Sequence, residues 1–523
     1  MMQFLRRSLS RTKMHMTELY NFAQDIFSRN RTRGEKIAYV DDAGTLTYAE
    51  LEQQAHGFAT HLLAAGLRAE ERLMLLAHDC TDWPVAFLGS QIAGVVPVCL
   101  NTLLTEDDYA YMLDHARPSA VVVSAALLDV FKAASNKAAH VVSHVWVSRG
   151  ETPSFDAACQ AAPLAQCHPS GADDMAFWLY SSGSTGKPKG AVHSHGNLRH
   201  TAQLYGDGVL GLRENDVCFS AAKLYFAYGL GNGLSFPLWA GATTVLMAER
   251  PTPHAIFKRW TQATHQPTVF FGAPTGFAGM LASTDRPAPN AIALRLCSSA
   301  GEALPKQLGE QFKAIYGCDI VDGIGSTEML HIYLSNTPTD VRYGTSGKPV
   351  PGYEMSLRAE NGSEAGVGEM GDLLIKGPSA ALFYWADNAK TRATFQGEWT
   401  RSGDKYTKDD AGYFTYSGRS DDMLKVSGQY VSPFEVEGAL MERPAVLEAA
   451  VVGVNDDNGL TRVKAYAVLK PGFAASEALD TEIKAFVKNR LAPHKYPRVL
   501  VIVAELPKTA TGKIQRFRLR ELG

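Results

Sequence analysis

Short apolar runs alternate with amphipathic stretches over about the first 320 residues of the chain. Between about 19 and 139, the runs at 95–100 and 120–123 have the length of buried strands, and the segments between them have helical spacing. The same alternation returns after about residue 174, with runs at 175–179, 243–247, 268–271 and 294–298. Strands that alternate with helical segments are typical of a parallel sheet with crossover helices. The pattern therefore predicts a layered α/β fold.

The boundaries of one early helix can be predicted from single residues. Thr47 stands before an amphipathic stretch and Glu50 follows it by three positions, which is the capping-box arrangement that begins a helix. The helix is expected to run to about Ala65. Gly66 is suited to end it, because glycine adopts the left-handed backbone conformation at low cost.

The longest apolar stretch, residues 83–100, is interrupted by Ser90, Gln91, Gly94 and Pro97. A membrane-spanning helix needs about 20 mainly apolar residues in succession. The stretch therefore predicts a helix that runs into a core strand, and we expect no membrane partner.

The pattern changes twice in the last third of the chain. From about residue 343, short strands and turns rich in Gly and Pro predict a smaller β-rich subdomain. After a boundary near 418–421, the residues predict a compact α+β unit. Its expected elements are a helix that begins at 436, strands at 447–452 and 464–469, and a helix at 479–491. A chain of 523 residues is also long enough for at least two domains.

The composition excludes some classes of function but does not identify the function itself. Hydrophobic residues are 46%, charged residues 20%, and the formal net charge is −3. This charge gives no indication of a nucleic-acid partner or of an anionic membrane surface. The seven cysteines are scattered, with no Cys-x-x-Cys pair and no histidines at metal-ligand spacing. Such a set predicts free thiols in a reducing compartment, and hence a cytoplasmic protein.

Residues 1–16 are set apart from the predicted fold. They contain Arg6, Arg7, Arg11 and Lys13, no acidic residue and no apolar core of a secretory signal. We interpret the segment as a disordered or extra N-terminal piece, upstream of a start at Met14 or Met16; a transit-like peptide is the alternative.

The first candidate site is the loop at 180–190, Tyr-Ser-Ser-Gly-Ser-Thr-Gly-Lys-Pro-Lys-Gly, which follows the apolar run at 175–179. Its glycines allow backbone N–H groups to converge, and its hydroxyls and lysines add donors, which suits a polyphosphate. A flexible linker is the plain alternative. A Walker loop is excluded by spacing, because only two residues separate Gly183 from Gly186 and Pro188 follows Lys187.

Three further segments carry candidate chemistry. In 322–328, Asp-Gly-Ile-Gly-Ser-Thr-Glu, a hydroxyl beside a carboxylate can hold a phosphate oxygen and Mg²⁺ together, although Thr-Glu also commonly begins a helix. The segment 298–305 reads as a strand-to-helix turn. The segment 507–514, Pro-Lys-Thr-Ala-Thr-Gly-Lys-Ile, would by itself carry only solvated lysines.

These motifs, in this order, closely resemble those of the acyl-adenylate-forming (ANL) superfamily, which contains acyl- and aryl-CoA ligases, adenylation domains of peptide synthetases and beetle luciferases. The resemblance covers the chain from about residue 17 onward. It implies an N-terminal adenylation domain over 17–420, with αβαβα layers and a β-barrel-like subdomain. It also implies a small, mobile α+β lid domain over 421–523.

The resemblance also implies the nucleotide site. ATP contacts are expected from Ser182, Gly183, Ser184, Thr185, Gly186, Lys187, Gly301, Glu302, Ala303, Asp322, Gly323, Ile324, Asp404 and Arg419. Thr327 is expected on the α-phosphate and Glu328 on Mg²⁺. Many members have tyrosine where Ile324 stands, so aliphatic contact is expected to replace ring stacking on the adenine.

The predicted lid supplies the remaining parts of the family cycle. Lys513 is expected to reach between the acid and the α-phosphate, where a flexible cation orients the attack and stabilises developing charge. Asp421 corresponds to the hinge. Lys425 and Gly428 correspond to the loop that lines the pantetheine tunnel in a second conformation.

The acyl pocket is expected around residues 223–232. Amino-acid-activating relatives have aspartate where this chain has Ala227, so a substrate ammonium would be buried without a partner. Phe226 and Tyr228 favour a flat ring, whereas Tyr225 is expected in the core. Gly325, His331 and Ile332 would close the other side, with His331 either a ring contact or a core histidine. This pattern resembles the benzoate–CoA ligases.

We therefore expect an AMP-forming ligase that joins benzoate or a close aryl carboxylate to coenzyme A, with ATP and Mg²⁺, in aromatic compound catabolism. A homodimer is left open. The alternatives in the same class are a 4-hydroxybenzoate or 2-aminobenzoate synthetase and a stand-alone adenylation enzyme that serves a carrier protein. The alternatives in other classes are a luciferase-like oxygenase and a non-catalytic nucleotide sensor.

Overall fold

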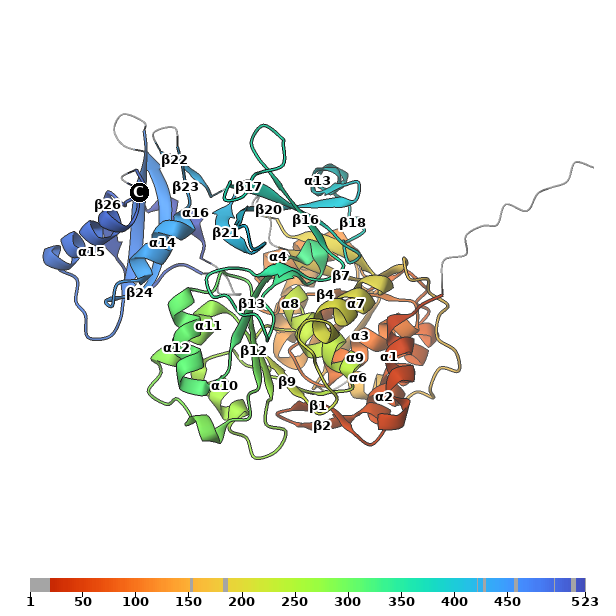
Figure 1. Cartoon of the computed structure of the whole chain (residues 1–523). Helices are drawn as coiled ribbons and strands as arrows, with labels where there is room; N and C mark the ends of the chain where they lie inside the picture. The colour runs from red at the N-terminus through yellow and green to blue at the C-terminus, as the bar shows by residue number, and fades with distance from the viewer. Residues whose placement is uncertain are drawn as a thin grey trace, which may run out of the picture.

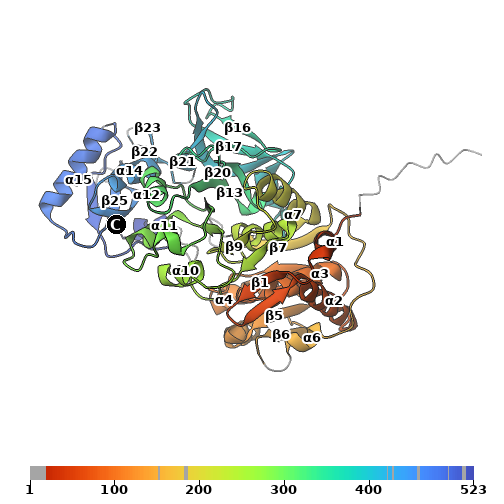
Figure 2. The same ribbon diagram turned by 60° about the horizontal axis from the view of Figure 1, so that its bottom comes forward.

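The structure is a computed structural model that describes residues 19–150, 154–181, 187–420, 422–426, 429–455, 460–492, 494–508 and 514–522. A large body is built on two mainly parallel sheets and a smaller antiparallel sheet. The C-terminal residues form a separate α+β unit at one end of this body, beside α11 and α12 (Figures 1 and 2). The predicted α/β class, with layered sheets and a small C-terminal domain, is confirmed.

The first sheet has seven strands in the order β18-β8-β7-β4-β3-β5-β6. Its strands are β3 (Arg72–Leu76), β4 (Val96–Cys99), β5 (Ala120–Ser124), β6 (His144–Ser148), β7 (Met175–Ser181), β8 (Lys189–Ser194) and β18 (Phe383–Tyr384). The five strands from β7 to β6 are parallel, whereas β8 pairs antiparallel with β7 and β18 pairs antiparallel with β8. The associated helices are α2 (Tyr48–Ala64), α3 (Asp82–Ile92), α4 (Glu106–Ala116), α5 (Leu128–Lys137) and α6 (Phe155–Cys159).

The second sheet has nine strands in the order β15-β14-β13-β12-β11-β9-β10-β1-β2. Its strands are β1 (Ile37–Asp41), β2 (Gly44–Thr47), β9 (Val217–Ser220), β10 (Thr243–Val245), β11 (Val269–Gly272), β12 (Leu296–Ser299), β13 (Ile320–Gly325), β14 (Ile332–Ser335) and β15 (Lys348–Pro349). The helices with it are α1 (Phe22–Asn30), α7 (His195–Thr201), α8 (Ala227–Leu230), α9 (Phe236–Ala240), α10 (Pro253–Trp260), α11 (Pro274–Ala282) and α12 (Lys306–Tyr316). One buried cluster joins Tyr39 of this sheet to Phe177 of the first, so the two sheets share a core.

The predicted β-rich part is an antiparallel sheet in which β21 pairs with β20. Its elements are β16 (Glu354–Arg358), β17 (Gly371–Lys376), β19 (Phe395–Gln396), β20 (Trp399–Lys408) and β21 (Phe414–Arg419), with α13 (Asn388–Thr394) between strands. Tyr406 and Phe414 pack into the same cluster as Tyr333 of β14, which fixes this sheet against the second one.

The C-terminal unit has its own core. It comprises β22 (Leu424–Val426), β23 (Gln429–Val431), α14 (Pro433–Met441), β24 (Val446–Asn455), β25 (Thr461–Leu469), α15 (Glu477–Arg490), β26 (Val499–Ile502) and α16 (Arg516–Glu521). Val436 and Leu440 of α14 pack with Ile483 and Val487 of α15 over the sheet. The predicted boundary near 418–421 falls at the end of β21, before β22, and the domain limits themselves stay a prediction.

Most sequence-predicted elements are present. Thr47 caps α2 with the capping box that it forms with Glu50, and Gly66 follows the helix with a φ of +90°. The stretch 83–100 is a helix followed by a strand, as expected. The antiparallel strand β8 was not predicted, because its residues carry no alternation of apolar and polar positions.

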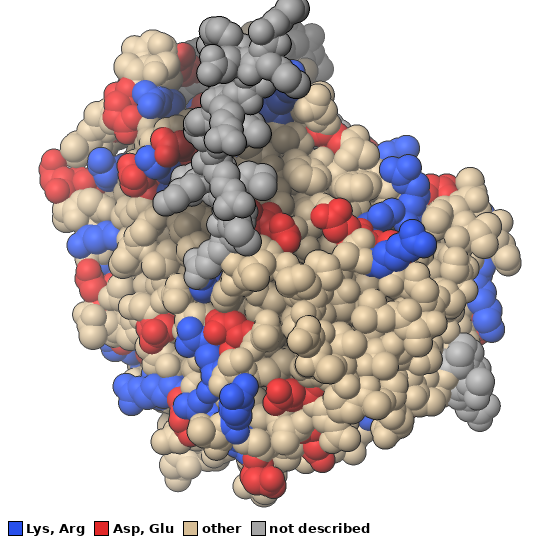
Figure 3. Space-filling view, turned by 90° about the vertical axis from the view of Figure 1, so that its right-hand side faces the viewer, with Lys and Arg blue, Asp and Glu red and all other residues tan. Residues whose placement is uncertain are grey.

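The surface and the cysteines are consistent with the composition. Basic and acidic side chains are interspersed on the face shown in Figure 3. All seven cysteines are free, and six of them are buried. Among the described residues, no helix is both long and apolar enough to cross a bilayer.

Candidate functional site

The phosphate loop connects β7 to β8. Its predicted contact residues Ser182, Gly183, Ser184, Thr185 and Gly186 lie outside the described residues, so their placement stays a prediction. On the C-terminal side of the loop, Lys187 is exposed and its Nζ lies 5.1 Å from the ring centre of Tyr111. The Tyr111 hydroxyl donates to the Pro188 carbonyl at 3.3 Å. Helix α4 therefore supports one end of the loop.

The predicted adenine segments lie together because β12 and β13 are neighbouring parallel strands. Their C-terminal ends open into a cavity of about 420 Å³, which is lined by Ala303 and Asp322 and by Tyr416 and Phe434 from β21 and α14. Asp322 is buried and its Oδ1 has no hydrogen-bond partner. Burial raises the pKa of this carboxyl well above its ordinary value. An unsatisfied buried acceptor of this kind suits a polar ligand.

The other predicted adenine residues lie next to Ala303 and Asp322 in the chain. Gly301 is exposed with a φ of +96°, and a Cβ there would meet no atom within 4 Å. Glu302 and Ile324 are half-buried, and Gly323 lies within β13.

Strand β13 leads directly into the turn that carries the predicted catalytic pair. Thr327 and Glu328 form a 3₁₀ turn with Met329, and Ser326 caps the turn by accepting from the Met329 amide. The Glu328 carboxylate accepts a hydrogen bond from the Tyr384 hydroxyl at 2.7 Å. The turn therefore lies between the second sheet and the β18 edge of the first.

The predicted ribose residues face each other across β20 and β21. Asp404 and Arg419 are register partners, and Arg419 Nη1 donates to Asp404 Oδ1 at 3.1 Å. Arg419 also donates to the Ser402 carbonyl. Gly403 lies between them with a φ of +75°, and a Cβ at this position would lie 2.8 Å from Arg419 Nη2. The positive φ at this position is a conformation that glycine adopts at low cost.

Aromatic rings pack around His331, one of the residues predicted for the acyl pocket. The ring centres of Tyr205, Tyr228 and Phe236 lie 4.5–5.4 Å from that of His331. His331 Nε2 lies 3.3 Å from the Tyr228 carbonyl, while Nδ1 is buried without a partner. Burial lowers the pKa of His331 to about 3, so the ring is neutral at physiological pH. The surroundings of His331 are therefore aromatic and uncharged among the ring contacts described.

A chain of hydroxyls lies behind the ring of Tyr228. Its hydroxyl donates to Ser298 Oγ at 3.1 Å, and the Tyr205 hydroxyl lies 3.3 Å from the same oxygen. Phe226 is the N-cap residue of α8, and Ala227 begins that helix. Tyr225 is 3% exposed in the main core, as predicted.

Gly325 and Ile332 are register partners on β13 and β14. A Cβ on Gly325 would lie 2.5 Å from the His331 carbonyl oxygen. This close approach holds the backbone of His331 directly against the strand that leads to Thr327.

Most of the predicted lid residues lie outside the part of the chain that the structure describes. Asp421, Gly428 and Lys513 lie outside the described residues. The backbone of Lys425 pairs with that of Tyr430 in the β22–β23 hairpin, but its side chain is not among those described. Lys508 and Ile514 form an isolated bridge, and Lys508 Nζ binds Glu448 at 2.7 Å.

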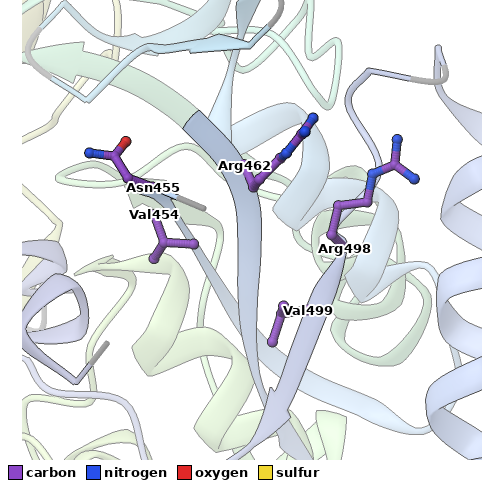
Figure 4. A pocket seen from close by; sticks show the side chains of 5 residues that line it. All are labelled: Val454, Asn455, Arg462, Arg498 and Val499. Carbon is purple, nitrogen blue, oxygen red and sulfur yellow. The ribbon is translucent and has the colours of Figure 1, made fainter. Parts of the chain in front are cut away.

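A second pocket, of about 580 Å³, lies on the sheet of the C-terminal unit. It is lined by Val454, Asn455, Arg462, Arg498 and Val499, and the two arginines extend to the same side (Figure 4). It contains none of the residues predicted for the nucleotide or the acid.

The described residues contain no group of three or more His, Cys, Asp or Glu side chains that could hold a metal by themselves. Mg²⁺ often binds through one or two carboxylates together with substrate phosphates. Glu328, on a turn next to the phosphate-loop strand, fits that mode of binding.

Several polar side chains at the site were not predicted. They are His193, Tyr205 and Tyr384; Ser298 was quoted within its segment but given no role. Tyr384 and Glu328 are 56 residues apart, and His193 and Thr327 are 134 apart. No local spacing pattern could have joined them, and only strand pairing does so.

Comparison with known proteins agrees with this architecture. The family model described as "AMP-binding enzyme" matches residues 26–385, and "AMP-binding enzyme C-terminal domain" matches residues 435–513. The chain is 55% identical to a benzoate–CoA ligase of Thauera aromatica over 96% of both chains. It is 45% identical to a 4-hydroxybenzoate–CoA/benzoate–CoA ligase of Rhodopseudomonas palustris, over 96% of this chain and 94% of that protein.

Among solved structures, a benzoate CoA ligase from Burkholderia xenovorans superposes with a TM-score of 0.91 at 56% identity, over 96% of this chain and all of that one. The family models, the sequence identity and the shared fold lead to one conclusion. This chain belongs to the AMP-binding enzyme family, the acyl-adenylate-forming superfamily that its motifs resemble.

Proposed function

We propose that this protein is an ATP-dependent ligase that joins benzoate to coenzyme A through a benzoyl-adenylate intermediate and releases AMP and pyrophosphate. The main observation in favour of benzoate as the acid is the set of uncharged aromatic side chains around His331. The names of the relatives from Thauera aromatica and Burkholderia xenovorans support the same acid.

The pocket favours a flat, uncharged ring for physical reasons. The described rings around His331 are those of Tyr205, Tyr228 and Phe236, and none of them carries a charge. The first residue of α8, Ala227, provides no carboxylate for a substrate ammonium, and burying an unpaired ammonium is costly. Aromatic neighbours instead provide stacking and edge contacts for a benzoate ring.

In the first half-reaction, the loop at 182–187 binds the phosphates of ATP, Asp322 recognises the adenine, and Asp404 with Arg419 holds the ribose. The carboxylate of benzoate attacks the α-phosphate, and pyrophosphate leaves. Thr327 binds the α-phosphate, and Lys513 bridges the acid and the phosphate, which orients the attack. Mg²⁺, when held by Glu328 and the phosphates, neutralises part of their charge.

In the second half-reaction, the thiol of coenzyme A attacks the acyl carbonyl and AMP leaves. The C-terminal unit turns about Asp421, which removes Lys513 and brings Lys425 and Gly428 to the pantetheine tunnel. Hinge closure of this kind can limit turnover. We place the reaction in the breakdown of aromatic acids and, given the free cysteines, in the cytoplasm.

The acid is tested by pyrophosphate release and acyl-CoA formation across benzoate, 4-hydroxybenzoate, 2-aminobenzoate, cinnamate, acetate and phenylalanine. Benzoate is expected well ahead in kcat/KM. A higher kcat/KM for acetate or phenylalanine than for benzoate would contradict the proposal that the acid site selects a flat aromatic ring. A carrier protein accepted in preference to coenzyme A would contradict the choice of thiol.

The role of Lys513 is tested by measuring the two half-reactions separately. Lys513→Ala is expected to lower benzoyl-adenylate formation at least about 100-fold, because the developing charge loses its cation. Transfer from preformed benzoyl adenylate to coenzyme A is expected to stay within about threefold of the wild type. Equal losses in both half-reactions would remove the proposed role.

A further inference from the structure

The backbone of the Thr327–Glu328 turn is held from two sides by residues outside the motif. Three consecutive carbonyl oxygens accept hydrogen bonds from distant residues: Thr327 from His193 Nε2 at 2.8 Å, Glu328 from the Ala381 amide at 2.7 Å, and Met329 from Ser379 Oγ at 2.7 Å. Each of these bonds constrains the position of one peptide unit. The turn is therefore fixed both by β8 and by the segment that leads into β18.

The His193 side chain is fixed in one tautomer. Asn197 Nδ2 donates to the Ala380 carbonyl at 3.0 Å, which sets the orientation of the amide. The same nitrogen lies 2.9 Å from His193 Nδ1, so Nδ1 accepts and the ring proton is on Nε2. The ring is buried and stacks on Phe177 at 5.2 Å between ring centres. His193 is therefore a preformed donor for the Thr327 carbonyl.

The Glu328 side chain is fixed by Tyr384. The phenol donates to Oε1 at 2.7 Å, and Tyr384 is only 3% exposed. Hydrogen bonds to a carboxylate are stronger than those between neutral groups. This bond restricts rotation of the carboxylate, so its two oxygens have defined directions before any ligand binds.

His193 and Tyr384 come from one pair of strands. In the β8–β18 register, Tyr384 pairs with Ala191 and Phe383 pairs with Val192, which immediately precedes His193. Strand β8 begins at Lys189, directly after the phosphate loop. The strand that anchors the loop therefore also anchors the turn.

On the basis of the proposed function, we propose that His193 and Tyr384 are positioning residues that set Thr327 and Glu328 relative to the phosphate loop. His193 acts on the backbone of Thr327, and Tyr384 acts on the carboxylate of Glu328. Their contribution is preorganisation of groups that meet the α-phosphate and Mg²⁺.

The role of Tyr384 is tested with Tyr384→Phe, which removes the hydroxyl and keeps the ring. The Mg²⁺ concentration for half-maximal benzoate-dependent pyrophosphate exchange is expected to rise about tenfold. Binding of Mn²⁺ with a non-hydrolysable ATP analogue, followed by electron paramagnetic resonance, is expected to weaken by a similar factor. Transfer from preformed benzoyl adenylate to coenzyme A is expected to stay within twofold, because that step does not involve the triphosphate.

The role of His193 is tested with two variants. His193→Phe keeps a ring against Phe177 but removes the donor, and kcat for adenylation is expected to fall about tenfold with little change in the KM for benzoate. His193→Gln places an amide N–H near the position of Nε2 and is expected to restore at least half of the lost rate.

The matched control is Tyr48→Phe, because the Tyr48 hydroxyl is also buried and donates to a backbone carbonyl, that of Ala242, at 2.7 Å. Unchanged metal requirement and Mn²⁺ binding in Tyr384→Phe would overturn the proposal for Tyr384. Equal losses in both half-reactions, or no rescue by His193→Gln, would overturn it for His193. If no acid supports exchange in the wild type, the proposed function fails, whereas the Mn²⁺ measurement still tests Tyr384.

Discussion

The predicted acyl pocket and the Thr327–Glu328 turn both adjoin the strand pair of β13 and β14, yet they are built in opposite ways. At the pocket, aromatic rings surround the neutral His331, whose Nδ1 has no partner. At the turn, three carbonyls and one carboxylate all accept hydrogen bonds from distant residues. In the proposed function, the pocket selects by making charge costly, and the turn works by having its donors and acceptors in fixed positions.

This difference follows from what each region binds. A benzoate ring offers no hydrogen bonds, so discrimination there must come from the desolvation cost of the wrong substituent. A phosphate that gains and redistributes charge during reaction needs groups that do not have to reorganise. The following changes test this contrast, from the largest expected effect to the smallest.

Ala227→Asp places an ionisable carboxylate at the first residue of α8, where the pocket has no charge. Benzoate-dependent pyrophosphate release is expected to fall at least about 100-fold, since the new charge is desolvated and repels the substrate carboxylate. Ala393→Asp, on the exposed face of α13, is the control. Wild-type kcat/KM in Ala227→Asp would show that Ala227 does not line the pocket.

Gly325→Ala tests whether the two regions are mechanically joined. The new Cβ would lie 2.5 Å from the His331 carbonyl oxygen, so β13 and β14 must separate. The KM values for benzoate and for ATP are both expected to rise, each about tenfold or more. Gly276→Ala, where a Cβ meets nothing within 4 Å, is the control. A rise confined to one substrate would mean that the regions respond independently.

Ser298→Ala removes the shared partner of the Tyr228 and Tyr205 hydroxyls. The freed phenol can then bond a ring hydroxyl, so the preference for benzoate over 4-hydroxybenzoate is expected to fall about tenfold in kcat/KM. Ser235→Ala is the matched control, because Ser235 Oγ is buried without a partner. If the preference does not change, Ser298 does not help to determine specificity.

Each region also contains a buried histidine whose pKa is lowered by burial: His331 in one and His193 in the other. His195, near His193 in the chain, is a third, and burial lowers its pKa to about 4. The unfolded chain takes up a proton below about pH 6.5 and folded His195 does not, so stability is present above that pH and is lost as the pH falls toward 4. His195→Asn is expected to reduce the loss in unfolding free energy between pH 7 and 6 by about 0.7 kcal/mol.

The measurement is urea unfolding at each pH. Asparagine keeps an acceptor for the Phe22 amide, which donates to His195 Nδ1. The slope with pH, and not the absolute stability, is therefore the relevant quantity. An unchanged slope would mean that His195 has the same pKa in the folded protein as in the unfolded chain.

The sequence was informative wherever the determining interactions are local. Thr47 and Glu50 predicted the start of α2, and apolar runs predicted β4, β5 and β7. Motif resemblance then brought together Asp322, Asp404 and Arg419. The structure places Asp404 and Arg419 opposite each other on β20 and β21, although 15 residues separate them in the chain.

The positions that escaped prediction depend on pairing between distant segments. Strand β18 has only two residues, too few to show any alternation, yet it carries Tyr384 to Glu328. In the sequence, nothing distinguishes His193 from other residues after the phosphate motif. Its role is visible only in the structure, where its Nε2 contacts the Thr327 carbonyl. Hydrogen bonds of this range leave no periodic trace in one sequence.

The shared strand pair has a practical consequence for altering substrate choice. Replacements on β14 that reshape the predicted acyl pocket are expected to displace β13 as well, and with it the Thr327–Glu328 turn, because Gly325 and Ile332 are in register. Replacements in α8, which belongs to neither strand, leave that coupling intact. A laboratory that wishes to retarget the enzyme to bulkier acids should therefore diversify residues 226–228 first and leave the hairpin unchanged.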